Sequence, residues 1–213
     1  MHASYVVSVN LGQALAAGWA GHLGRTAIDK RPVGGRVQAG RLGLRGDEQA
    51  DRVGHGGPYQ AVYAYAREDL DWWAGALGRP LRDGLFGENL TTTGLEVTCA
   101  VIGERWRVGG VLLEVTQPRI PCGVFRNWMG EEGWVKRFAE AGRAGAYLRV
   151  IEEGALGAGD PIEVVHRPEH GATVRDAFRV NYGDPGPLAR LAEAPDLPPV
   201  VRVIVQKAAR TAQ

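Results

Sequence analysis

Short apolar runs, separated by glycine and proline, dominate the hydrophobic pattern of the chain. Runs of this length between turn residues are typical of β-strands in a β-rich fold. Residues 111–116 are mostly apolar on both faces, which predicts a central strand. Gly109 and Gly110 precede this run and permit a tight hairpin turn from residues 105–108. The other predicted strands are residues 5–10, 61–65, 97–102, 146–151 and 161–165.

A helical period of apolar residues occurs in two segments of the first 165 residues. Residues 67–77 and residues 131–141 each place four apolar side chains on one stripe, which predicts two amphipathic helices. Trp73 and Trp134, the tryptophans of these stripes, are expected to pack in the core. The stripes are Leu70, Trp73, Ala74 and Leu77 in the first segment, and Trp134, Val135, Phe138 and Ala139 in the second.

The pattern changes after residue 165, so we predict a domain over residues 1–165 and a three-helix extension over residues 166–213. Thr173 is a suitable N-cap for a helix over residues 174–182. Two further short helices are predicted at residues 187–194 and 199–209, where prolines mark the boundaries. Three short helices bury little surface alone, so they are expected to pack on the β-rich domain, on each other or on a second subunit.

Charge and composition exclude several classes of protein. The net charge is +1, which gives no broad basic surface for nucleic acid or for an anionic membrane. No run approaches a membrane span of about 20 apolar residues, and the N-terminus lacks the basic start of a signal peptide. The sequence therefore predicts a cytoplasmic protein that binds neither nucleic acid nor membrane.

The two cysteines are expected to differ. Cys99 lies in a predicted strand and is interpreted as an inert core residue. Cys122 follows a strand and two prolines that stiffen the chain, and Gly123 leaves the approach to its sulfur open. Arg119 supplies a cation nearby, and a neighbouring cation favours the thiolate that binds soft metals. A buried turn cysteine and a Cys99–Cys122 disulfide remain alternatives.

Three further segments carry candidate polar chemistry. His55, followed by Gly56 and Gly57, could act as a proton donor beside a turn that approaches a ligand closely. Residues 86–93 include Asn89 and Thr91, and could form a nest of backbone amides and hydroxyls around an anion. Lys30 stands in a proline-stiffened turn. Each segment alone also fits a plain structural turn or a solvated side chain.

The order of these segments resembles the MOSC domain family, and specifically its YiiM-type members. The resemblance spans roughly residues 5 to 165, and residues 166–211 resemble the three-helix extension of that subgroup. It rests on six segments: residues 26–33, 44–51, 55–58, 61–65, 86–90 and 117–122.

The resemblance implies a β-barrel-like fold that binds molybdenum cofactor, a pterin dithiolene with a phosphate. It implies that Cys122 ligates the metal, and that the protein reduces N-hydroxylated compounds such as 6-hydroxylaminopurine, a detoxifying activity. We expect His55 to deliver a proton or contact the metal's oxo ligand. The remaining cofactor contacts are predicted to be Lys30, Gly56, Gly57, Asn89, Thr91 and Arg119.

Electrons are expected to come from a separate reductase, because no flavin or nicotinamide fingerprint is evident and two cysteines cannot hold an iron–sulfur cluster. A homodimer is an open possibility. Two other functions remain as alternatives, namely a carrier of molybdenum cofactor and a sulfurtransferase with a persulfide on Cys122. The chain lacks an aminotransferase-like portion with a pyridoxal lysine, which disfavours sulfur transfer.

Overall fold

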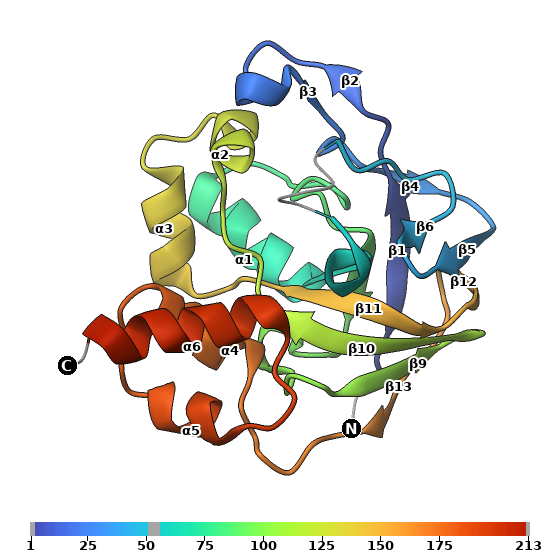
Figure 1. Ribbon diagram of the computed structural model, residues 1–213. Helices are drawn as coiled ribbons and strands as arrows, with labels where there is room; N and C mark the ends of the chain where they lie inside the picture. Colours follow the sequence, from blue (N-terminus) through green and yellow to red (C-terminus); the bar gives the residue numbers. More distant parts are fainter. Residues whose placement is uncertain (1–2, 51–55, 212–213) are drawn as a thin grey trace.

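The computed structural model describes residues 3–50 and 56–211 as a mostly β fold with helices packed around it (Figure 1). Its main sheet has the strand order β13-β9-β10-β11-β7-β8-β1-β4, and β7 with β8 is its parallel pair. These strands are β1 (Tyr5–Leu11), β4 (Arg31–Val33), β7 (Val62–Ala66), β8 (Leu90–Thr93), β9 (Arg105–Val108), β10 (Val111–Gln117), β11 (Ala146–Glu152) and β13 (Ile162–His166).

The main sheet curls so that the beginning of β1 approaches the segment that leads into β13. Tyr5 forms an isolated bridge with Pro161, and the Val6 amide donates to Asp160 O at 3.0 Å. This seam is short, so the fold is barrel-like without a closed ladder. Two small sheets add β12 (Gly154–Gly157), β5 (Arg36–Gly40) and β6 (Gly43–Leu44), and the hairpin of β2 (Leu15–Ala16) and β3 (Arg25–Thr26).

The predicted central strand and its hairpin are confirmed. Every residue of β10 is buried, and β10 lies between β9 and β11 in the sheet. Val111 pairs with Val108 across the turn, where Gly109 has a φ of 54°. Because β10 is fixed by neighbours on both sides, the segment that leaves its end has a rigid starting point.

One predicted strand is wrong. Residues 97–102 form the 3₁₀ helix η3 (Val97–Cys99) and a single bridge from Val101 to Thr173. Val97 and Thr98 are buried there, while Cys99 is partly exposed and not a sealed core residue. The local preference of β-branched residues for strands is overridden by the packing of this turn against α4 (Val174–Asn181).

Aromatic side chains form a second core beneath α1 (Arg67–Leu77), α2 (Gly123–Met129) and α3 (Trp134–Ala141). Trp73 and Trp134 are almost fully buried, with ring centroids 4.7 Å apart, so the expectation of core tryptophans is confirmed. The sequence pattern missed α2, which is short. Its position matters because Cys122 is its N-cap residue.

The C-terminal helical segment packs on the sheet. Thr173 caps α4 with the expected side-chain bond, and Asp176 completes a reciprocal capping box. α5 (Leu188–Glu193) and α6 (Pro199–Thr211) follow, and their buried residues belong to the same apolar cluster as the strands (Figure 1). None of the helices in the described ranges has the length and apolar character needed to cross a membrane.

Candidate functional site

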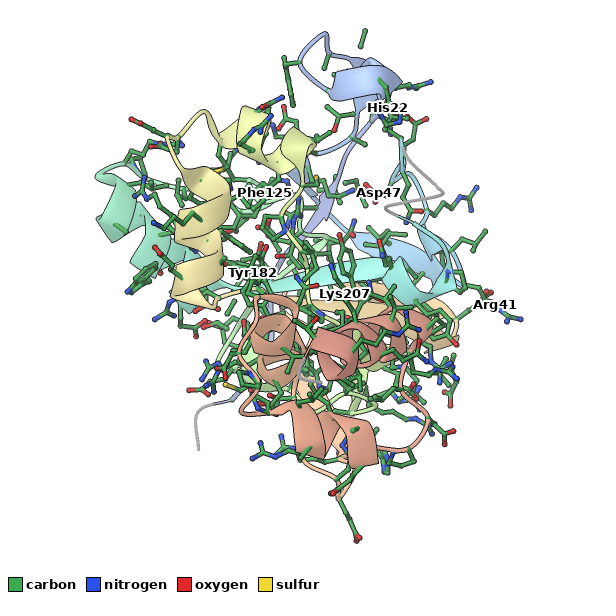
Figure 2. The ribbon with its side chains drawn as sticks, turned by 60° about the vertical axis from the view of Figure 1, so that its left-hand side comes forward. His22, Arg41, Asp47, Phe125, Tyr182 and Lys207 are labelled. Carbon is green, nitrogen blue, oxygen red and sulfur yellow. The ribbon has the colours of Figure 1, made fainter. Side chains whose placement is uncertain are left out.

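A cavity of about 360 Å³ lies where the β2–β3 hairpin, the segment after β6 and the start of α2 meet. Figure 2 shows Asp47 below the helical turn that carries His22, and both residues line this cavity. Polar and charged side chains account for much of the wall. They are His22, Arg25, Thr26, Lys30, Asp47, Glu48, Gln49, Gln60, Tyr63, Asn89, Arg119, Cys122, Arg126, Asn127 and Tyr147.

Cys122 is placed in this cavity by the end of β10. The strand leads into the Pro118 and Pro121 segment, after which Cys122 takes an extended conformation and caps α2. The Arg126 amide donates to Cys122 O at 2.9 Å. A Cβ at Gly123 would meet no heavy atom within 4 Å, so the approach beside the sulfur is open. No disulfide joins Cys122 to Cys99.

Arg119 is a buried cation held against the same cavity. Its Nη1 donates to Phe86 O at 2.6 Å, and its guanidinium lies 4.2 Å from the Phe125 ring centroid and 5.1 Å from that of Tyr63. Burial opposes its charge, but Tyr147, Tyr63, Cys122 and Glu88 together hold the pKa of Arg119 above its usual value. Arg119 is therefore a permanent positive charge in the electrostatic range of Cys122.

A second cation is built into a network around Asp47. The Asp47 carboxylate accepts from Lys30 Nζ, from the Gly12 amide at 2.8 Å and from Asn89 Nδ2 at 2.9 Å. Asn89 Oδ1 in turn accepts from the Tyr63 amide at 3.2 Å. Burial lowers the pKa of Lys30, while Asp47 counteracts that effect. Asp47 thus holds Lys30 and Asn89 side by side on the same wall of the cavity.

The nest predicted at residues 86–93 is filled by the chain itself. The amides of Gly84 and Phe86 donate to the fully buried Glu88 carboxylate at 2.5 and 3.0 Å, and Thr91 Oγ1 donates to it at 3.0 Å. Gly87 does line the cavity, and a Cβ there would approach Ile28 Cγ1 to 3.1 Å. These donors therefore hold an internal carboxylate and not an external anion.

The structure brings four of the predicted site residues to one cavity: Cys122, Arg119, Lys30 and Asn89. Thr91 is fully buried behind the wall. Gly56 and Gly57 are not among the described residues that line the cavity, and His55 lies outside the described residues.

Sequence reasoning missed several lining residues. Asp47 stood in a segment quoted for the family resemblance, so its position carried a signal. Tyr63 and Tyr147 lay in predicted strands, where an apolar pattern does not say which face lines a cavity. The part of the wall made by residues 20–25 had no local signal, whereas residues 26–28 stood in another segment quoted for the resemblance. Within the described residues, no group of three or more His, Cys, Asp or Glu side chains could hold a metal ion by itself.

Comparison with known proteins identifies the family. A model described as the MOSC domain matches residues 51–163. Escherichia coli YiiM is 34% identical over 163 residues, which cover 75% of this chain and 72% of YiiM. Bacillus subtilis YflK is 39% identical over 179 residues, which cover 84% of this chain and 81% of YflK. The chain belongs to the MOSC domain family.

Two further matches bear on structure and activity. The crystal structure of YiiM from Geobacillus stearothermophilus has a TM-score of 0.79 and 28% identity, covering 96% of this chain and 98% of that one. A protein of Gibberella moniliformis named Reductase is 37% identical over 177 residues, which cover 81% of this chain but 31% of that protein. The likeness to YiiM therefore extends over nearly the whole described fold.

Proposed function

We propose that this protein is a molybdenum cofactor-dependent reductase of N-hydroxylated compounds, with Cys122 as the metal ligand. The observation that carries the proposal is a cysteine on the wall of a cavity that also holds two buried cations, Lys30 and Arg119. Membership in a family associated with molybdenum cofactor, and a relative named Reductase, support it.

The donor set around the cavity fits the cofactor. A thiolate is a soft ligand suited to molybdenum, and Cys122 is the one cysteine among the described lining residues. Lys30 and Arg119 are the residue types that hold an anionic phosphate or dithiolene by charge-assisted hydrogen bonds. When bound, the cofactor would supply the two electrons that reductive cleavage of an N–O bond requires.

The chain's own residues would bind the substrate and keep protons at defined atoms. Burial raises the pKa of Tyr147, so its hydroxyl keeps its proton at neutral pH as a donor near Arg119 and Cys122. Asp47 pairs with Lys30 and holds the Asn89 amide in one orientation. His55 remains our candidate for proton delivery, a role that stays a prediction because His55 lies outside the described residues.

The test is to produce the protein in a host that makes the cofactor, and to measure both molybdenum content and reduction of 6-hydroxylaminopurine with an artificial electron donor. We expect bound molybdenum and turnover in the wild type, and loss of both in Cys122→Ser. Cys99→Ser is the matched control, because Cys99 does not line the cavity. Full molybdenum content and full reduction in Cys122→Ser would refute the assignment.

The same preparation separates the alternatives. Molybdenum without turnover favours a cofactor carrier, and a persulfide on Cys122 without metal favours sulfur transfer. We also propose that electrons come from a separate reductase. Efficient turnover of the isolated chain with NAD(P)H alone would contradict that part of the proposal.

A further inference from the structure

Two arginines stand at the mouth of the cavity, outside the buried cations. Arg25 belongs to β3 and Arg126 to α2, and both side chains line the cavity although both residues are exposed. The lining also includes Asp47 and Glu48, but Asp47 is engaged by Lys30, and Glu48 accepts from the Ala14 amide at 2.6 Å. Asp47 and Lys30 offset each other, and the single carboxylate of Glu48 offsets one of the two arginines, so these side chains leave a net positive charge at the mouth.

The outer arginines keep most of their hydrogen-bond donors available. Among the described residues, the Arg25 guanidinium donates to Ala14 O at 2.9 Å, and that of Arg126 donates to Asn127 Oδ1 at 3.1 Å. Neither forms an ion pair within these residues. The buried cations differ, because Lys30 is paired with Asp47 and Arg119 is bound to Phe86 O. Each guanidinium has five N–H groups, so the outer pair has several donors left for a ligand.

A contact between the hairpin and α2 sets the position of these two arginines. The Trp19 and Trp128 rings stack with centroids 5.9 Å apart, and Asn127 Nδ2 donates to Trp19 O at 2.7 Å. Trp128 Nε1 also donates to Leu85 O at 2.7 Å, which ties α2 to the body of the fold. β2 and β3 pair with each other alone among the described strands, so this clamp is what fixes the hairpin tip beside α2.

We propose that Arg25 and Arg126 form an outer subsite for a phosphate monoester at the mouth of the cavity. A phosphate monoester has three terminal oxygens and up to two negative charges, enough to bind two guanidinium groups at once. A ligand with a single carboxylate has only two oxygens and one charge to offer them. The inference deepens the proposed function, on which it rests, because it makes an N-hydroxylated nucleotide a preferred substrate over the free base. The cofactor's own phosphate is the other source of the same chemistry.

The test uses 5′-AMP and adenosine as unreactive probes and measures their dissociation constants by calorimetry, first on the cofactor-free chain. We expect AMP to bind about a hundredfold more tightly than adenosine, because each of the two charge-assisted contacts should contribute about tenfold. Arg25→Gln and Arg126→Gln should each weaken AMP binding about tenfold and change adenosine binding less than twofold, because one charge-assisted contact is lost. Arg202→Gln is the matched control, since Arg202 is exposed on α6, away from the cavity.

Trp19→Ala tests the clamp separately from charge. It removes no cation, but it should weaken AMP binding by roughly threefold to tenfold if the stack holds the two arginines in place. Circular dichroism confirms that each variant is folded. Equal affinity for AMP and adenosine, or unchanged AMP affinity in both arginine variants, would overturn the subsite.

The cofactor-loaded chain distinguishes the two sources of phosphate. If the nucleotide is the ligand, loaded protein still binds AMP and the arginine variants keep their molybdenum. If the cofactor's phosphate occupies the subsite, loading abolishes AMP binding and both variants lose molybdenum. Failure of the proposed reductase activity is visible separately, because the binding measurements on the cofactor-free chain need no turnover.

Discussion

Glu88 is the buried group whose ionisation should most affect the stability of the site. Its carboxylate is fully buried and has no ion pair among the described residues. Burial raises its pKa from 4.5 to about 7, and the amides of Glu88 and Gly84 with the Thr91 hydroxyl oppose part of that rise. Replacing it by glutamine keeps the shape and removes the titration.

The sign and size of the effect follow from the raised pKa. Below pH 4.5 the side chain is neutral in both the folded and the unfolded protein, so it costs nothing. Between pH 4.5 and about 7 the unfolded chain ionises while the folded chain keeps its proton, so the free energy of unfolding falls as pH rises. The total loss is about 3 kcal/mol, at 1.36 kcal/mol per pKa unit.

The assay is urea unfolding of wild type and Glu88→Gln at intervals from pH 4 to pH 9. Glutamine leaves one amide donor without its acceptor, so the variant should be about 1–3 kcal/mol less stable at acidic pH. Above pH 7 the wild type has lost about 3 kcal/mol through Glu88, so the variant should become equal to the wild type in stability or more stable. Glu132→Gln is an exposed control whose difference from wild type should stay flat. A flat difference for Glu88→Gln would refute the reasoning.

Three other substitutions test separate parts of the fold. Thr173→Ala removes the capping box with Asp176 and should cost about 1 kcal/mol in thermal or urea unfolding, with Thr173→Ser recovering most of it. Gly154→Ala would place a Cβ in steric conflict with Gly110 O, so we expect a loss of about 1–3 kcal/mol, and an unchanged melting temperature would contradict this close approach. Asp47→Asn leaves the buried Lys30 ammonium unpaired and should cost about 3–5 kcal/mol near pH 7. Because burial already lowers the pKa of Lys30, that loss should diminish as unfolding is measured toward pH 10, and a pH-independent loss would argue against it.

Local sequence determined the elements whose signals lie within a few residues of one another. β10 was predicted because its residues are mostly apolar on both faces, and its turn was predicted from Gly109 and Gly110. α1 was predicted with the observed bounds, and Thr173 was recognised as a cap, because helical period and capping chemistry act over three or four residues. The stiff segment that presents Cys122 was also predicted from local sequence, because Pro118 and Pro121 restrict the backbone next to them.

Tertiary structure decided which distant segments meet. Lys30, Asp47, Asn89 and Cys122 come from four separate parts of the chain, and only the pairing of strands across the sheet brings them to one cavity. Tertiary packing also turned the amides near Glu88 inward and made a 3₁₀ helix from a segment rich in β-branched residues. The physical reason is the range of the interactions: propensity and periodicity act over a few residues, whereas burial and charge depend on neighbours that the local pattern does not specify.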